Sequence, residues 1–451
     1  MKRNVSSDIQ RLNIQVNQSI DDQFYTNQTL AGLTQDLKTL NTSCFGMRKE
    51  IKELSTATYP GTTEASTDPS RNNTFPSAPV TTQDLQASTT DESEYLTPSK
   101  TVPPTPVTTQ DSDHHATPSP AAGRDLYDAS SRGDLERVKR ILAEGDVDIN
   151  YRGQWSRTPV MQAAWKGHRD VVEFLVGRGA DVSLVDSNGN NVLHFACAGG
   201  DLETVKLILS MNVVNINSRG WYNKTPVMMA LGSGHRDVVE FLVGRGADVS
   251  LVDRNGNNVL LWACIGGDLE TVKLILSLNV GDVDINYKGW YSRTPVMQAA
   301  WKGHRDVVEF LVDRGADVSL VDSNGNNVLH FACAGGDLET VKLILSMNVV
   351  NINSRGWKNK TPVMWAAGSG HRDVVEFLVG GGADVSLVDR WGNNVLLWAC
   401  IGGDLETVKL IMSMNVVDIN ARNNDGKTAA DITRDWGRQR MLDLLVSRGA
   451  H

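Results

Sequence analysis

One block of this 451-residue sequence is repeated almost without change, and this repetition constrains the fold more than any other feature. The 64 residues from Thr158 to Trp221 recur from Thr294 to Trp357 with one difference, Gly177 against Asp313. The Thr-Pro pair that opens the block returns at Thr225, Thr294 and Thr361, and Asn191-Val192-Leu193 and its copies stand about midway between these pairs, so the basic unit has 33 to 36 residues. A period of this length is typical of proteins that stack copies of one supersecondary unit.

Each unit predicts two helices followed by a hairpin. Pro159 stands at a first helical position, where proline has no N–H to lose, and a short apolar helix is expected as far as Gly167. A second apolar run, Arg169 to Val176, has helical spacing and ends just before Gly179, which can adopt a left-handed C-cap. The stretch from Asp186 to Gly189 contains an Asn-Gly pair and predicts a tight hairpin turn.

This unit resembles the ankyrin repeat, whose signature reads Thr-Pro-Leu-His-x-Ala. The matching stretches of the first full unit are 158–164 and 179–182, while the signature histidine survives only as His194 and His330. The resemblance covers residues 125–451, about ten units counting two end units with a polar outer side. It implies an all-α ankyrin-repeat solenoid of helix-helix-hairpin units.

Two segments of other kinds precede the array. Half of residues 55–124 are Ser, Thr or Pro, so we expect a disordered linker there. Apolar residues from Leu30 to Leu54 follow a three-four spacing that extends more weakly back to residue 9, so residues 1–54 are a candidate coiled-coil helix. The seam over residues 9–54 predicts a homo-oligomer; a lone amphipathic helix, or no stable helix, is the alternative, because glycine, threonine and asparagine lower helix propensity there.

Composition and charge exclude several classes of protein. The formal net charge of −9 and the lack of a Lys/Arg block argue against nucleic-acid binding. No apolar run reaches the ~18 residues of a membrane span, and the first residues lack the apolar stretch of a signal peptide, so we expect a cytoplasmic or nuclear protein. Four of the five cysteines recur at the repeat spacing, which indicates reduced, buried thiols.

No set of residues indicates catalysis. A nucleophile, base or metal set gathered at one point would have to break the repeat pattern, and none does. His168 and its three copies each follow a glycine at the start of a second helix, where an imidazole can bond nearby backbone. We therefore predict no catalytic residue, no cofactor and no metal site, and we expect that the chain is not an enzyme.

The resemblance to ankyrin proteins implies binding at the hairpin tips and at the exposed end of the first helix. These positions are rich in aromatic and basic residues, which are the types that dominate interface energetics. The candidate protein-binding residues are Trp155, Trp165, Lys166, Trp221, Tyr222, Trp290, Tyr291, Trp301, Lys302, Trp357, Trp391 and Trp436. Their character predicts an apolar, acidic partner segment; the alternative is that the tip aromatics lie flat on neighbouring hairpins.

The sequence thus predicts a non-catalytic scaffold or adaptor that binds partner proteins along the concave groove and hairpin tips. The alternative is a regulatory subunit that presents substrates to a phosphatase, kinase or ubiquitin ligase. Retention of a catalytic partner in a pull-down would distinguish the second role from the first. Resemblance of fold supports only the general role.

Overall fold

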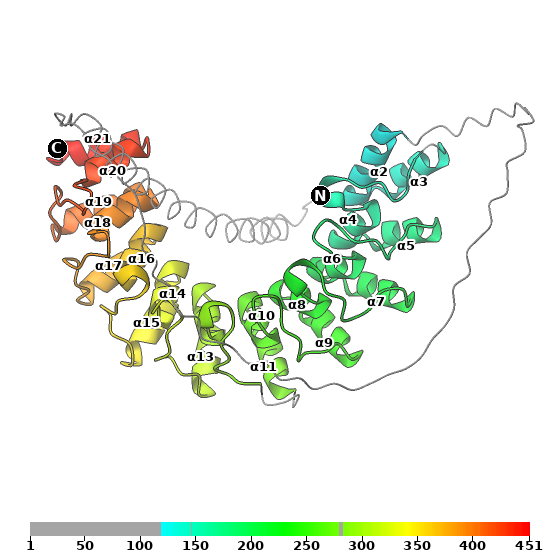
Figure 1. Ribbon diagram of the computed structural model, residues 1–451, viewed down its shortest axis with the longest axis horizontal. Coiled ribbons are helices and arrows are strands. Elements are labelled where there is room, and N and C mark those ends of the chain that lie inside the picture. The colour runs from blue at the N-terminus through cyan, green and yellow to red at the C-terminus, as the bar shows by residue number, and fades with distance from the viewer. Residues whose placement is uncertain (1–118, 146, 279–282) are drawn as a thin grey trace, which may run out of the picture. The chain divides into compact units, whose positions relative to one another are not determined.

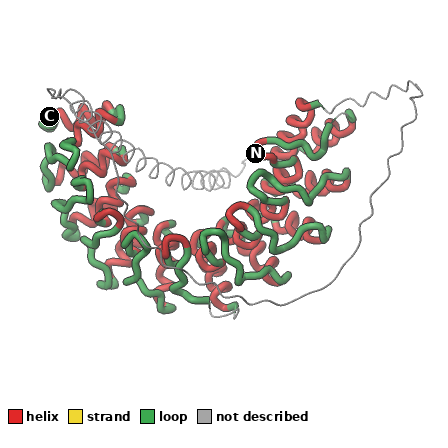
Figure 2. Tube along the Cα trace, viewed as in Figure 1, coloured by secondary structure: helices red, strands yellow, loops and turns green. Residues whose placement is uncertain are grey.

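The computed structural model describes residues 119–145, 147–278 and 283–451, and the predicted coiled-coil seam lies outside them. Within these residues the secondary structure is helical, with no β-strand and one isolated bridge between Val321 and Asn327 (Figure 2). The helices form ten consecutive pairs: α2 (Pro120–Arg132) and α3 (Leu135–Ala143), α4 (Pro159–Trp165) and α5 (Arg169–Gly177), α6 (Val192–Gly199) and α7 (Leu202–Ser210), α8 (Pro226–Gly232) and α9 (Arg236–Gly244), α10 (Val259–Gly266) and α11 (Leu269–Ser277), α12 (Pro295–Trp301) and α13 (Arg305–Asp313), α14 (Val328–Gly335) and α15 (Leu338–Ser346), α16 (Pro362–Ser369) and α17 (Arg372–Gly380), α18 (Val395–Gly402) and α19 (Leu405–Met414), α20 (Ala429–Asp435) and α21 (Gln439–Ser447). The predicted helix-helix-hairpin unit is therefore confirmed.

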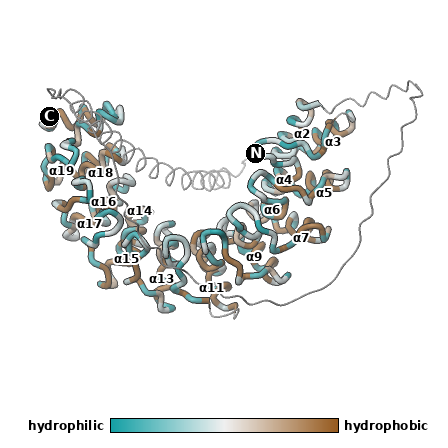
Figure 3. Tube along the Cα trace, viewed as in Figure 1, coloured by the Kyte–Doolittle hydropathy of each residue, from teal (hydrophilic) through white to brown (hydrophobic). Residues whose placement is uncertain are grey.

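The helix pairs stack side by side in chain order (Figure 1). The first helix of each pair, here called the inner helix, packs on the inner helices before and after it, and the second, outer helix packs likewise on its outer neighbours. Val160, Ala163 and Ala164 of α4 are fully buried, and the equivalent residues of the other inner helices join one continuous core. Hydrophobic segments accordingly recur in every pair (Figure 3).

Glycine sets how closely the inner helices approach one another. A Cβ atom built on Gly199 would lie 2.3 Å from the carbonyl oxygen of Trp165 in the preceding inner helix, which is closer than any real contact. Gly335 has the same relation to Trp301, at 2.1 Å. A larger residue at these positions would separate consecutive units, so the glycine is required by backbone packing.

The helix ends follow the local signals in the sequence. Asp201 begins α7 and accepts a hydrogen bond from the amide of Thr204 at 2.7 Å, as an N-cap residue does. Gly179 follows α5 with φ +91°, and Asn212 follows α7 with φ +54°, so both adopt the left-handed conformation expected after a helix. The first helix begins at Pro120, so residues 120–124, which the composition assigns to the linker, are helical.

Each inner helix from α4 onward is preceded by a hairpin loop, here called a finger. In alternate units the finger carries a short 3-10 turn: η1 (Gln154–Ser156), η2 (Trp221–Asn223), η3 (Trp290–Ser292) and η4 (Trp357–Asn359). Two successive residues of each turn, such as Trp155 and Ser156, have φ near +57°. The amide of Ser187 donates to the carbonyl of Trp155 at 2.9 Å, and equivalent backbone bonds join each of these turns to the next finger.

None of the helices in the described residues is both long enough and apolar enough to cross a membrane.

Candidate functional site

The fingers and inner helices form a surface whose charge is opposite to that of the whole chain. We call this surface the finger face; it comprises residues 151–166, 186–200, 219–234, 253–267, 288–303, 322–336, 355–370 and 389–403. These ranges contain thirteen Lys and Arg, four Asp and no Glu, in a chain of net charge −9. Eleven of the thirteen cations are at least partly exposed, whereas all four aspartates are buried. The exposed charge of the finger face is therefore positive.

The four aspartates of the finger face are satisfied within their own turns. Asp186 is 4% exposed, and its Oδ1 accepts hydrogen bonds from the amides of Asn188 at 2.9 Å and Asn190 at 2.8 Å. The Arg157 Nε lies 3.7 Å from the other carboxylate oxygen. Asp253, Asp322 and Asp389 accept the same two amide bonds in their units. These carboxylates stabilise the turns of their own fingers and are not exposed at the surface.

A basic residue stands directly before Thr-Pro in alternate units, and its side chain turns inward between aromatic rings. The guanidinium of Arg157 lies 5.1 Å from the ring centroid of Trp165 and 4.9 Å from that of Phe195 in the next unit. Lys224 lies 4.2 Å from Trp262 of the next unit. Each cation thus links two units through contacts of the cation–π type.

Lys360 is the most enclosed member of this set. It is 2% exposed, and its Nζ lies 4.7, 4.6 and 3.4 Å from the ring centroids of Trp357, Trp365 and Trp398. Burial lowers the pKa of Lys360 to about 7, although the carboxylate of Asp389 opposes that shift. The indole Nε1 of Trp398 donates to Asp389 at 3.0 Å, so lysine, ring and carboxylate form one connected cluster.

The predicted binding residues from 155 to 391 lie on the finger face, but their side chains differ in how far they are exposed. Trp155, Tyr222 and Tyr291 are 59%, 44% and 46% exposed and stand at finger tips. The others are partly buried against their neighbours: Trp165, Lys166, Trp221, Trp290, Trp301, Lys302, Trp357 and Trp391. Trp357 and Trp391, for example, meet edge to face with centroids 5.9 Å apart. The surface is therefore a row of packed rings with single exposed aromatics at the tips.

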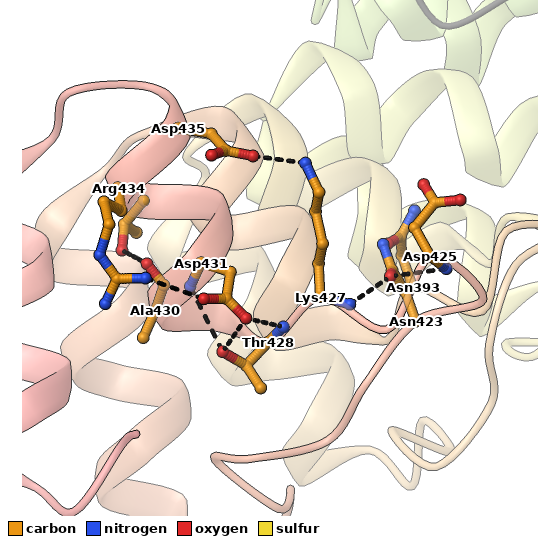
Figure 4. Close-up of polar contacts among 10 residues, drawn as sticks. Asn393, Asn423, Asp425, Lys427, Thr428, Ala430, Asp431, Arg434 and Asp435 are labelled. Atoms are coloured by element: carbon orange, nitrogen blue, oxygen red, sulfur yellow. Dashed lines mark hydrogen bonds and ion pairs between the residues drawn. The ribbon is translucent and has the colours of Figure 1, made fainter. Parts of the chain in front are cut away.

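Trp436 differs in position from the tryptophans with which the sequence grouped it. Counting from the threonine that opens each unit, Asp435 occupies the place of Trp165, and Trp436 that of Lys166. Trp436 is 54% exposed. Lys427, equivalent to Arg157, pairs with Asp435 at 2.5 Å, and Asp431 bonds Thr428 (Figure 4). The closing unit thus replaces the cation–ring contact with an ion pair, as suits an end unit facing water.

Histidines in the array have structural contacts. The Nε2 atom of His168 lies 3.2 Å from the carbonyl oxygen of Ser131 in the preceding unit, and the other histidines at this position repeat the contact. His194 and His330 are each 1% exposed, and burial lowers the pKa of each to about 4. In the part of the chain that the structure describes, no three His, Cys, Asp or Glu side chains gather as a metal site would require.

The cations before Thr-Pro, which the sequence predicts beside the tip aromatics, turn inward in the structure. Arg157, Lys224, Arg293 and Lys360 hold consecutive units together instead of standing at the rim. The signal that could have found them is their alternation. The intervening units carry asparagine at the equivalent place, and five residues after each asparagine the inner helix of the same unit carries a large aromatic: Phe195, Trp262, Phe331 or Trp398.

Comparison with known proteins agrees with this architecture. The family described as "Ankyrin repeats (3 copies)" matches residues 126–186, 161–253, 245–322, 314–389 and 378–451. The chain is 24% identical over 317 residues to the human transient receptor potential cation channel subfamily A member 1, covering 68% of this chain and 28% of the channel. It is 24% identical over 393 residues to the Arabidopsis thaliana E3 ubiquitin-protein ligase KEG, covering 72% of this chain and 24% of the ligase.

A third relative is the mouse B-cell lymphoma 3 protein homolog, 29% identical over 228 residues, which are 49% of this chain and 51% of that protein. The chain spans about half or less of the length of each of these three relatives. The family matches together run from residue 126 to residue 451, which is well over half of the chain. The protein therefore belongs to the ankyrin repeat family.

Proposed function

We propose that the protein is a non-catalytic interaction scaffold whose finger face binds acidic, apolar segments of partner proteins. Ankyrin repeats imply protein–protein interaction in general. The observation that carries the specific proposal is the composition of the finger face, whose ranges hold eleven Lys and Arg that are at least partly exposed and no exposed Asp or Glu, in a chain of net charge −9. A partner rich in Asp and Glu would be attracted to this face and repelled by the rest of the array.

The aromatic residues of the finger face supply the apolar part of the proposed interaction. Trp155, Tyr222 and Tyr291 stand exposed at successive alternate tips, each beside exposed or partly exposed basic residues. Large rigid aromatics lose little side-chain entropy on binding and are enriched among hot spots. An acidic segment with apolar residues at intervals would meet both features.

Single-stranded nucleic acid is less well suited to this surface. Bases stack on open ring faces. Here many faces are covered, since Lys358 lies 4.6 Å from the centroid of Trp357 and 4.4 Å from that of Trp391. Lys224 covers Trp221 at 4.8 Å in the same way. The rings hold the array's own cations, which favours a protein partner.

A selection experiment tests the proposal. Peptides are selected from a random display library on the full-length protein, and the best is then titrated against two charge-reversal pairs. Lys166→Glu with Lys302→Glu changes the finger face. Lys206→Glu with Lys342→Glu is the matched control. These two lysines occupy the same position of two outer helices, α7 and α15, and the side chain of each is about two-fifths exposed.

The expected result is an acidic, apolar peptide that loses at least tenfold in affinity with the first pair and keeps its affinity with the second. Equal loss with both pairs would place the binding surface elsewhere. Selection of basic peptides, or tighter binding of an oligothymidine strand than of any peptide, would overturn the proposal. The regulatory-subunit alternative predicts in addition that a kinase, phosphatase or ubiquitin ligase copurifies with the intact protein.

A further inference from the structure

The internal duplication places the same local surface at two points of the array. The first copy comprises Arg157, Trp165, Lys166 and Phe195; the second comprises Arg293, Trp301, Lys302 and Phe331. From residue 158 to 221 and from 294 to 357 the two sequences differ at one position, which lies at the end of an outer helix. No difference within these blocks falls on the finger face.

The two copies also have the same geometry. The guanidinium to tryptophan centroid distance is 5.1 Å in the first copy and 5.4 Å in the second, and the guanidinium to phenylalanine distance is 4.9 Å and 4.8 Å. Lys166 lies 4.4 Å from the Trp165 centroid, and Lys302 lies 5.0 Å from that of Trp301. The duplication has preserved the arrangement of side chains as well as the sequence.

Each copy is complete within two adjacent units, because the cation, its tryptophan and the phenylalanine of the next inner helix are consecutive along the stack. The copies are four units apart. Since neighbouring helices pack at roughly 10 Å, about 40 Å separates them. One short segment that fills the first copy therefore leaves the second available for another segment.

We propose that the array contains two equivalent sites, each for one copy of the same acidic, apolar protein segment, so that one chain bridges two such segments. This inference rests on the proposed function, since it assumes that the finger face is the binding surface. The occupant is set by charge, because the finger face exposes cations and buries all its carboxylates. The finger tips beside the copies differ, Trp155 in the first and Trp290 with Tyr291 in the second, so the two affinities should agree within about tenfold.

The duplication also supplies a variant that removes one copy and keeps the junction native. Deleting residues 158–293 joins Arg157 to Thr294, which is followed by the same residues that follow Thr158. The first helix pair then packs on α12, whose sequence is identical to that of α4. Because repeat arrays are stabilised by nearest-neighbour contacts, the shortened chain should fold with one copy of the site.

The test is isothermal titration with the acidic peptide selected on the full-length protein. The intact chain should bind two peptides and the deletion variant one. Lys166→Glu alone and Lys302→Glu alone should each leave one site of unchanged affinity, which keeps the test decisive even if the deletion variant does not fold. One peptide per intact chain, or loss of both sites from either single substitution, would overturn the inference while leaving the proposed function in place.

The affinity of a tandem peptide is a second, independent test for two sites. Two copies of the selected peptide joined by roughly 50 Gly and Ser residues span about 40 Å root-mean-square, so both sites of one chain can be filled at once. Binding to the intact chain should tighten on the order of a hundredfold relative to the single peptide, with no such gain for the deletion variant or for Lys302→Glu. An equal gain in all three proteins would show that the gain does not depend on two sites in one chain, and would contradict the inference. Failure to select any acidic peptide would overturn the proposed function itself.

Discussion

The Nζ atom of Lys360 lies 3.4 Å from the ring centroid of Trp398, a residue of the following unit. This contact joins two units through a lysine that is almost wholly removed from water. The surrounding tryptophan rings do not replace the hydration of the ammonium group, and burial lowers its pKa to about 7. The contribution of this buried lysine to the stability of the array therefore depends on pH.

Replacing Lys360 with methionine, which has a similar length, should stabilise the array. At pH 6 the lysine is charged in both the folded and unfolded states, and its lowered pKa means that burial costs the charged form more than its attraction to Asp389 returns, so Lys360→Met should raise the free energy of unfolding by on the order of 1 kcal/mol or more. From pH 7 to about 10.5 the folded protein binds fewer protons than the unfolded chain, so the native protein gains stability and the advantage of methionine shrinks. Urea unfolding at pH 6 and pH 10 measures both effects.

Lys427 provides the control for that substitution, since it occupies the same position of the closing unit. It is paired with Asp435, which raises the pKa of Lys427. Lys427→Met removes an exposed ion pair and should lower stability by no more than about 1 kcal/mol. Equal destabilisation by both substitutions would contradict the account of Lys360.

Two buried histidines should make the array sensitive to acid. The pKa values of His194 and His330 are lowered to about 4 by burial, so the unfolded chain, with a pKa near 6.5, binds the proton first. Stability should therefore fall as pH drops from about 6.5 to about 4, by up to roughly 3 kcal/mol for each histidine. Other units carry leucine at this position, such as Leu261, so the pair His194→Leu and His330→Leu is a substitution from the chain itself. The urea midpoint of unfolding should fall less between pH 7 and pH 4.5 in this variant than in the native protein. An equal fall in both proteins would show that the two histidines do not cause the loss of stability in acid.

The finger tips store backbone strain that a substitution can reveal. Ser156 has φ +57°, a left-handed conformation that a β-branched residue adopts only at high cost. Ser156→Val should lower the free energy of unfolding by more than about 1 kcal/mol, whereas Ser156→Gly should leave it unchanged within about 0.5 kcal/mol, because relief of strain and loss of chain entropy nearly cancel. Thermal unfolding of both variants checks the sign. Equal stability of the two variants would contradict the left-handed tip.

Assembly through the N-terminal seam stays a prediction from the sequence. The apolar spacing from Leu30 to Leu54 should make the intact protein an oligomer in light scattering. Removing residues 1–60 should give a monomer with the same unfolding curve for the array. A monomeric intact protein would show that the seam forms no coiled coil.

The repetition in the sequence was enough to predict the helix pairs, because spacing of apolar residues, proline and glycine are local signals and each is repeated several times. It could not show the direction of the cations before Thr-Pro, since Arg157 contacts Phe195, a residue of another unit, and this contact exists only after stacking. The left-handed tips were missed for a related reason. Trp155 and Ser156 are not residues that favour positive φ, and the hairpin bond from the amide of Gly153 to the carbonyl of Arg157 imposes it.

The residue types of the candidate site could be predicted from the sequence, but the burial of each side chain could not. Aromatic and basic residues at the tips were visible in the sequence, and Tyr222 is indeed exposed. The offset of Trp436 by one residue can be counted from Thr428 in the sequence, but the prediction grouped Trp436 with Trp165, although Asp435 occupies that place and the tryptophan stands in the place of a lysine. The excess of cations on the finger face is visible in the sequence, and the structure adds that Asp186 and its copies are buried.

The most direct test of the central claim is the affinity of the selected acidic peptide for the double variant Trp165→Ala with Trp301→Ala. Phe174→Ala with Phe310→Ala is the matched control, because these two partly buried aromatics occupy the same position of two outer helices, α5 and α13, away from the finger face. With helical circular dichroism unchanged, the tryptophan pair should weaken binding by about thirtyfold, or about 2 kcal/mol, and the phenylalanine pair should not. Unchanged affinity in the tryptophan variant, or an equal loss in both variants, would contradict binding at the finger face.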